Sequence, residues 1–375
     1  MGPADELLDP RRRDLITRLS TIMEIEVIDS IGWACLWFAD LSTLEELVTG
    51  FERGPLSVSS IISCSLSNTK ERAKSIKACK RTAGSNEDLG EPSEDEETET
   101  EEPPTKKRRL ASDLRKASKR AGKQTAEQAL GHHNDTCILT GCTIPVEVAH
   151  IFPKSLGKNI EGLRDFWKCL QCFWTPQQVK AWKNRFLGSD GTETCSNLIC
   201  MVNNAHKLWE KAAFALKPLS LSEDERQLEV QFFWLPKHKY RKQVPLTAVP
   251  DPFPRNLSST NDQYKTVLFN NVTDTKLCSG DILTFKTGDP MGHPLPSMEL
   301  LNMQWVLHRV LALSGAAYAT DEELFPDPYM SFRRATAFGL YEEDSDWDSE
   351  MEVDEEEEGE EAEDSQGTPE GEAWE

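Results

Sequence analysis

The sequence predicts an α+β protein in which helical regions flank a central region that holds strands. Apolar residues recur at helical spacing in residues 8–80 and again after Ser297. Between these regions, the segment QLEVQFFWLP has the two-residue period of a half-buried strand. The apolar positions with that period are Leu228, Val230, Phe232 and Trp234.

Two stretches before residue 80 are predicted to be helical. The first begins at Asp9-Pro10, because proline is tolerated in the first turn of a helix. The second, IGWACLWFADLSTLEELVTGF, is interpreted as one or two helices with a break near Asp40-Leu41-Ser42. The apolar positions of the first helix are Leu15, Ile16, Leu19, Ile22 and Met23.

The region after the alternating strand contains one further strand and one long helix. Residues 241–296 are rich in Pro, Asn, Asp and Thr and are predicted to be mostly loop, with a strand at DILTFKT. Ser297 is a helix-capping residue with Glu299 close behind it, and the apolar run that follows ends at Gly315. We therefore expect an amphipathic helix between Ser297 and Gly315.

The net charge of −22 hides a division of the chain into oppositely charged tracts. Residues 341–375 carry 19 acidic side chains and no basic one, and residues 85–102 carry 10 and none. Without these 29 residues the net charge of the chain changes from −22 to +7. Residues 106–123 hold nine Lys/Arg against one Asp. Low hydrophobicity with blocks of like charge predicts disorder in residues 83–125 and in the acidic tail.

The basic cluster KKRR at 106–109, followed by further Lys/Arg pairs, has the composition of a nuclear-import signal. The alternative is a solvated basic tract that pairs with its acidic neighbour. No run of 18 apolar residues and no secretory signal is found, so we expect a nuclear or otherwise cytoplasmic protein that does not contact a membrane. The predicted divisions are 1–82 helical, 83–125 linker, 126–240 central domain, 241–335 C-terminal extension and 336–375 acidic tail.

The region from Cys137 to Trp209 contains the residues that point most specifically to a catalytic function. His150 ends a β-branched run, Asn197 opens a short apolar run, and His206 follows nine residues later at a predicted helix start. A neutral imidazole suits the base that activates water for phosphodiester cleavage, and one divalent ion can polarise the phosphate. The trio therefore indicates a one-metal phosphodiesterase site, although each residue alone is more often a core histidine or a turn asparagine.

The motifs CILTG, VAHIFP and SNLICMVNNAHKLW resemble the HNH nuclease domain, the ββα-metal or His-Me finger fold, in a form common in fungal proteins. The similarity extends through FALKPL and QFFWLP to the helix at 293–317, roughly half of the chain. The insertion FWKCLQCFWTPQQVKAWKNRF also resembles that subgroup and is predicted to be helical. The resemblance implies a ββα-metal core with His150 as general base, Asn197 as a bracing residue and His206 as a ligand of a divalent metal, Mg²⁺ above all. From the residues alone, Asn197 is a second candidate ligand.

One position departs from the family pattern. Many HNH enzymes have an aspartate directly before the first histidine, where it binds the metal, and this chain has Ala149. A hard cation prefers oxygen ligands, so the change should weaken Mg²⁺ binding. Glu147 lies on the same strand face as Ala149 and is one candidate substitute; Asn203 and Asn204 are others.

The cysteines near the site offer an alternative metal, structural zinc. Zinc held by four cysteines usually shows two CxxC pairs, and only Cys169 and Cys172 have that spacing here. Buried thiols are the preferred interpretation. The six cysteines concerned are Cys137, Cys142, Cys169, Cys172, Cys195 and Cys200.

The leading prediction is a metal-dependent HNH endonuclease that hydrolyses phosphodiester bonds in DNA. A second hypothesis, suggested by Ala149, is a catalytically degenerate HNH module that binds nucleic acid or protein in the nucleus. A third is a nuclear adaptor whose acidic tail contacts a basic protein partner. Acidic tracts commonly serve only solubility, so the third hypothesis is the least favoured.

Overall fold

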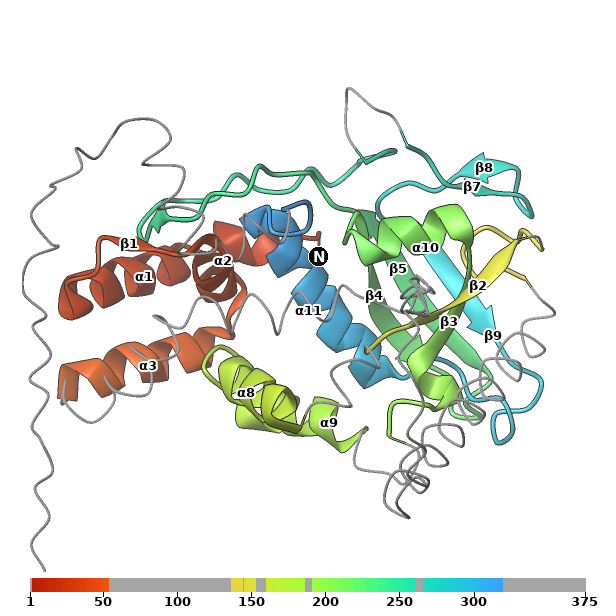
Figure 1. Cartoon of the computed structure of the whole chain (residues 1–375), viewed down its shortest axis with the longest axis horizontal. Coiled ribbons are helices and arrows are strands. Elements are labelled where there is room, and N and C mark those ends of the chain that lie inside the picture. Colours follow the sequence, from red (N-terminus) through yellow and green to blue (C-terminus); the bar gives the residue numbers. More distant parts are fainter. Residues whose placement is uncertain are drawn as a thin grey trace, which may run out of the picture. The chain divides into compact units, whose positions relative to one another are not determined.

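The computed structural model describes residues 2–53, 136–143, 145–152, 160–185, 191–260 and 266–319 (Figure 1). These residues form a mixed α+β unit within Met1–Phe325, and a second unit comprises Pro326–Glu375. The predicted linker, the KKRR cluster and the acidic tail all lie outside the described residues. None of the described helices combines the length and the apolar character needed to cross a membrane.

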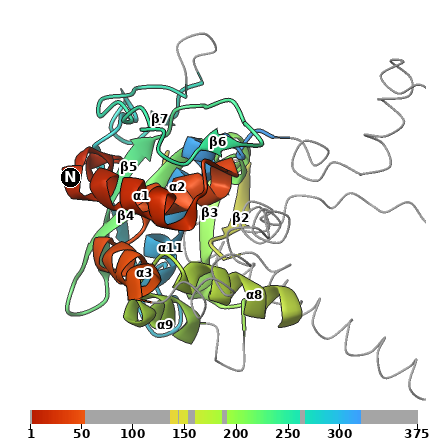
Figure 2. The same ribbon diagram turned by 90° about the vertical axis from the view of Figure 1, so that its left-hand side faces the viewer.

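The described part of the N-terminal region, residues 2–53, is mainly helical, as its periodicity predicts, and the rest of the predicted helical segment lies outside the described residues (Figure 2). The α1 helix begins at Pro10, and the Asp9 carboxylate accepts a hydrogen bond from the Arg11 amide at its start. The break predicted near residue 40 separates α2 from α3. The elements are η1 (Asp5–Leu8), α1 (Pro10–Met23), α2 (Ser30–Phe38) and α3 (Leu41–Arg53).

A β-hairpin followed by a short helix forms the centre of the chain. Strands β2 (Val146–His150) and β3 (Leu198–Val202) pair antiparallel, and α10 (Asn203–Glu210) follows β3 directly. The predicted helical insertion lies between the two strands and is confirmed as α8 (Ile160–Gln171) and α9 (Pro176–Asn184). Its tryptophans are buried, which favours a packing role for them over contact with nucleic acid. They are Trp167, Trp174 and Trp182.

A three-stranded antiparallel sheet in the order β4-β5-β9 follows the central hairpin and helix. Strands β5 (Gln227–Trp234) and β9 (Ile282–Lys286) lie in the two predicted strand segments. Strand β4 (Phe214–Leu221) contains Pro218 and has no two-residue alternation, so periodicity does not predict it. Four two-residue strands form the remaining pairs: β1 (Val27–Ile28) with β6 (Val244–Pro245), and β7 (Phe269–Asn270) with β8 (Thr275–Lys276).

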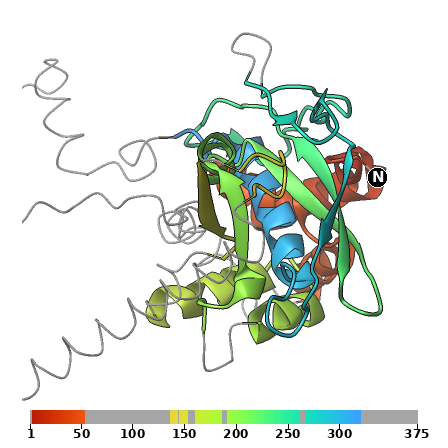
Figure 3. The same ribbon diagram turned by 90° about the vertical axis from the view of Figure 1, so that its right-hand side faces the viewer.

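The predicted C-terminal helix, α11 (Met298–Ser314), contacts both the N-terminal helices and the sheet (Figures 1 and 3). Its main contacts are with α2 and β4. Ser297 caps its start by accepting a hydrogen bond from the Leu300 amide, and Gly315 ends it with a positive φ of 75°. Because fourteen of its seventeen residues are buried, α11 is a central element of the core rather than a surface helix.

Candidate functional site

The register of the central hairpin determines where the predicted site residues point. Ala149 pairs with Ile199, and His150 pairs with Leu198 at the end of β2. Successive side chains on a strand face opposite sides, so Glu147 and Ala149 share one face while His150 lies on the other. Ala149 is fully buried in the main core, which leaves a methyl group where many HNH domains have a carboxylate.

His206 is held by a carboxylate from the neighbouring strand. It lies one turn into α10, is fully buried, and its Nδ1 is 2.6 Å from Oε2 of Glu147. The second oxygen of Glu147 accepts a hydrogen bond of 2.6 Å from Asn203 Nδ2. Partial burial would raise the pKa of Glu147, but the hydrogen bonds from His206 and Asn203 outweigh it and lower the pKa below its ordinary value. Glu147 is therefore an ionised partner that orients His206.

The other ring nitrogen of His206, Nε2, is buried and takes part in no hydrogen bond with another described residue. Oε1 of Glu210, one helical turn further along α10, lies 3.8 Å from this nitrogen. Glu210 also forms a 3.1 Å ion pair with Lys207. Neighbouring ligands of an octahedral cation bound at about 2.1 Å each lie about 3.0 Å apart, so these two groups would have to move closer together to bind one Mg²⁺ ion.

His150 lies at the end of β2 with only 8% of its surface exposed. Its Nε2 is 3.4 Å from Oε1 of Glu193, a contact that is too poorly aligned to count as a hydrogen bond. Its Nδ1 is buried and has no hydrogen-bond partner. A carboxylate beside one ring nitrogen favours the proton on that nitrogen and leaves the other nitrogen basic.

Asn197 connects the segment before β3 to the segment after β2. Its Oδ1 accepts a 2.7 Å hydrogen bond from the Phe152 amide, and its Nδ2 donates to the carbonyl groups of Phe152 and Thr192 at 3.0 and 2.9 Å. The Asn197 carbonyl also accepts from the Ile151 amide at 2.8 Å. These bonds fix the chain directly after His150, so Asn197 braces the segment that follows the histidine.

The predicted trio thus falls into two groups that the hairpin connects. Asn197 braces the His150 end of β2, and His206 on α10 contacts Glu147 on β2. Within the described residues no hydrogen bond or ion pair joins His150 to His206. Glu193 and Glu210 are additional candidates that the sequence reasoning missed. Glu210 could have been found from its four-residue spacing to His206 on one helix face. Glu193 lies in the return from the insertion, where no spacing signals it.

The donors present fit a cation only in part. Nowhere in the described ranges do three His, Cys, Asp or Glu side chains converge in an arrangement that would hold a metal ion. Two donors, His206 Nε2 and the Glu210 carboxylate, are close together, and Mg²⁺ commonly takes one or two protein ligands and completes its shell with water. The described cysteines are free thiols, and the zinc alternative stays a prediction.

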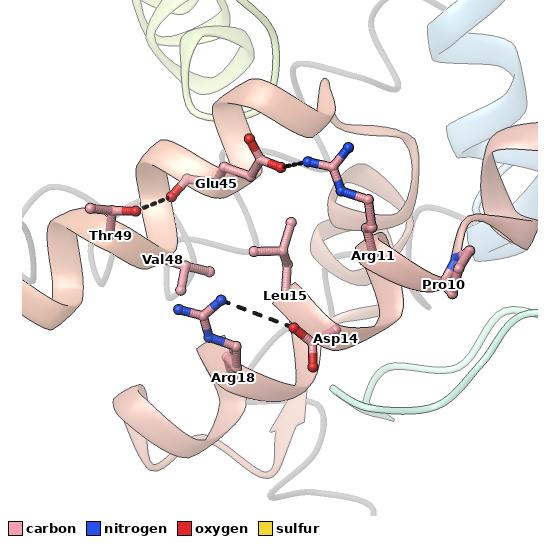
Figure 4. Close-up of a pocket in the computed structure, with 8 residues that line it drawn as sticks. All are labelled: Pro10, Arg11, Asp14, Leu15, Arg18, Glu45, Val48 and Thr49. Atoms are coloured by element: carbon pink, nitrogen blue, oxygen red, sulfur yellow. Dashed lines mark hydrogen bonds and ion pairs between the residues drawn. The ribbon is translucent and has the colours of Figure 1, made fainter.

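A cavity of about 630 Å³ lies away from these residues, between α1 and α3 (Figure 4). Its charged groups neutralise each other: Arg11 pairs with Glu45, and Arg18 is 4.0 Å from Asp14. Leu15 and Val48 form its apolar floor. The cavity shares no residue with the candidate site.

Comparison with protein families gives one assignment. Residues 137–217, which include β2, β3, α10 and the helical insertion, match the model of a family described as HNH endonuclease. Comparisons with curated proteins and with solved structures gave no match. The chain carries an HNH endonuclease domain over residues 137–217.

Proposed function

We propose that this domain is a metal-dependent endonuclease that hydrolyses phosphodiester bonds in DNA, using a ββα-metal site formed by β2, β3 and α10. The observation that carries the proposal is the environment of His206. One ring nitrogen contacts an ionised carboxylate, and the other is buried without a partner. Metal-binding histidines commonly have this arrangement, because a carboxylate on the outer nitrogen fixes the ring and raises the basicity of the inner one.

In this proposal His150 is the general base. The Glu193 carboxylate, 3.4 Å from Nε2, favours the tautomer that is protonated there, so Nδ1 would accept the proton of the attacking water. Burial of the ring keeps bulk water away and strengthens the influence of the carboxylate. Asn197 holds the backbone after His150 and thereby fixes the direction of the ring. Its amide oxygen already accepts the Phe152 amide, which favours bracing over metal binding as its role.

His206 Nε2 and the carboxylate of Glu210 would hold the metal ion, with water as the remaining ligands. When bound, a divalent ion polarises the phosphate and stabilises the leaving oxygen. Glu147 does not take the place of the aspartate that the family pattern puts at position 149, since its two oxygens are occupied by His206 and Asn203. Its part is to position the His206 ring.

Nicking of supercoiled plasmid tests this proposal. With Mg²⁺ or Mn²⁺ the protein should nick the plasmid, and EDTA should stop it. His150→Ala should lower the rate by about 10²–10⁴-fold, the usual contribution of a general base, while the circular dichroism spectrum stays unchanged. His293→Ala, at a half-exposed histidine outside the site, is the matched control and should cleave like the wild type. Unchanged nicking by His150→Ala would remove His150 from the mechanism.

The alternative, a domain that binds nucleic acid without cleaving it, is favoured by one observation, the buried methyl group of Ala149. It predicts DNA binding in a gel shift, weakened by salt, with no metal-dependent nicking by any variant. The nuclear location suggested by residues 106–109 is a further part of the proposal. Fluorescence microscopy of the chain with and without KKRR tests it.

A further inference from the structure

The segment Lys237–Lys242, with the sequence KHKYRK, lies between β5 and β6 and outside the residues that match the HNH family. We call it the basic strap. Four of its six side chains are exposed cations, and none of them forms an ion pair with another described residue. Those four residues are Lys237, Lys239, Arg241 and Lys242.

The strap is fixed to the core rather than free. His238 donates from Nδ1 to the Ala312 carbonyl at 3.1 Å, and its ring stacks on Phe253 at 5.8 Å. Gly315 lies directly under the strap: a Cβ on it would be 2.5 Å from the carbonyl carbon of Lys239. Directly after the strap, β6 pairs with β1. A surface that is already ordered loses little conformational entropy when it binds a partner.

The arrangement of the cations suits a repeating anion. Exposure alternates along the strap: Lys237, Lys239 and Arg241 are exposed, and His238 and Tyr240 between them are partly buried. In an extended chain, alternate side chains project from the same side about 7 Å apart. Three cations in such a row can each contact a different phosphate of one nucleic acid strand, and contacts of this kind position a protein without reading sequence.

Helix α11 connects the strap to the candidate site. Gln304 Nε2 donates to the carbonyl of Ile151, the residue after His150, and Ala312 contacts the strap through His238. Eight residues of α-helix separate these two contacts, a rise of about 12 Å. That rise corresponds to three or four base pairs of duplex at about 3.4 Å each. The axial separation of the two contacts along α11 is therefore within the length of a short duplex.

The HNH region itself has little charge with which to hold a polyanion, since residues 126–240 carry 13 Lys/Arg against 12 Asp/Glu, and two of those lysines belong to the strap. We propose that the basic strap binds the phosphate backbone of the nucleic acid substrate beside the cleavage site. This inference rests on the proposed function, because that function identifies the substrate as nucleic acid. It adds a binding surface that the HNH match does not include.

The test measures binding separately from cleavage. Anisotropy of a labelled 20-base-pair duplex in EDTA gives the dissociation constant at several salt concentrations. Lys239→Gln/Arg241→Gln removes two phosphate contacts, so the slope of log K against log salt should fall by about 2. At physiological salt the dissociation constant should rise roughly tenfold. Lys237 is left in place because its Nζ lies over the Tyr318 ring at 4.4 Å.

The matched control is Lys276→Gln/Lys286→Gln, which removes two exposed charges from β8 and β9. It should leave the slope unchanged, and an equal fall in both double variants would overturn the proposal. The strap proposal and the nuclease proposal can fail separately. If the protein is not a nuclease, metal-dependent nicking is absent, but the binding measured in EDTA is unchanged.

The alternative ligand of the strap is the acidic segment 341–375. The described chain ends at Ala319, and the preceding residue, Tyr318, contacts Lys237 of the strap. The binding series is therefore repeated with a chain that ends at residue 340. If the strap binds phosphates, the double variant lowers the slope by about 2 in this shorter chain as well. If the double variant has no effect there, the strap serves the acidic tract, and the proposal is wrong.

Discussion

His206 Nδ1 lies 2.6 Å from Oε2 of Glu147, a contact between residues 59 positions apart that joins α10 to β2. The contact places an ionised carboxylate behind a buried histidine whose opposite nitrogen has no partner. In metal sites a carboxylate in this position sets the tautomer of the ligating histidine and its direction. Glu147 therefore supports His206 from behind, while the oxygen ligand absent at Ala149 has to come from another residue.

Replacing Glu147 by glutamine should weaken metal binding without unfolding the domain. The amide can still accept a hydrogen bond from His206, but it lacks the negative charge of the carboxylate. We expect the Mg²⁺ concentration for half-maximal nicking to rise about 10-fold or more, the usual effect of losing such a partner. Glu229→Gln, at an exposed carboxylate on β5, is the control. An unchanged Mg²⁺ requirement in Glu147→Gln would mean that the contact with His206 is purely structural.

Glu210→Gln tests the second proposed metal ligand. Removing an oxygen donor 3.8 Å from His206 Nε2 should lower the nicking rate at limiting Mg²⁺ at least tenfold. Excess Mn²⁺ should recover part of the rate. Lys207→Gln separates metal binding from the loss of an ion pair. It removes the 3.1 Å ion pair between Lys207 and Glu210 and leaves the Glu210 carboxylate intact. Equal effects of the two variants would assign Glu210 to the ion pair with Lys207 and not to the metal.

Asn197→Ala should destabilise the fold. The change removes the hydrogen bonds that Asn197 makes with the Phe152 amide and with the carbonyl groups of Phe152 and Thr192. Each hydrogen bond contributes about 0.5–1.5 kcal/mol, so the free energy of unfolding should fall by about 2–4 kcal/mol. Urea denaturation measures this fall. Asn270→Ala, in an exposed turn where the side chain also accepts backbone hydrogen bonds, should cost much less; equal losses would contradict a bracing role for Asn197.

The sequence was sufficient to predict the helices whose ends are marked by capping residues. Asp9-Pro10 marks the start of α1, and Ser297 and Gly315 mark the two ends of α11. In α11 the caps were the more reliable signal, since a helix buried on most sides shows little amphipathic contrast. Strand β4 was not predicted, because Pro218 and its exposed second half obscure the alternation.

The sequence predicted where His150, Asn197 and His206 lie along the chain, but it did not predict which side chains contact them. The alternation of β2 places Glu147 on the same face as Ala149, but its contact with His206 depends on how α10 packs against the hairpin. Glu193 comes near His150 only because the insertion returns to the end of β2. Such contacts depend on tertiary packing, and local spacing in the sequence contains no information about them.

His308 should make the stability of the fold depend on pH. It is fully buried on α11, and burial lowers its pKa from 6.5 to about 4, although its hydrogen bond with the Phe214 carbonyl acts in the opposite direction. Between these values the unfolded chain binds a proton that the folded protein does not, so this contribution is present above pH 6.5 and is lost as the pH falls towards 4. From pH 7.5 to 4.5 the loss is about 2–3 kcal/mol. Urea denaturation of the wild type and of His308→Gln, which keeps a donor but does not titrate, should show their stability difference shrinking by that amount; parallel pH profiles would contradict it.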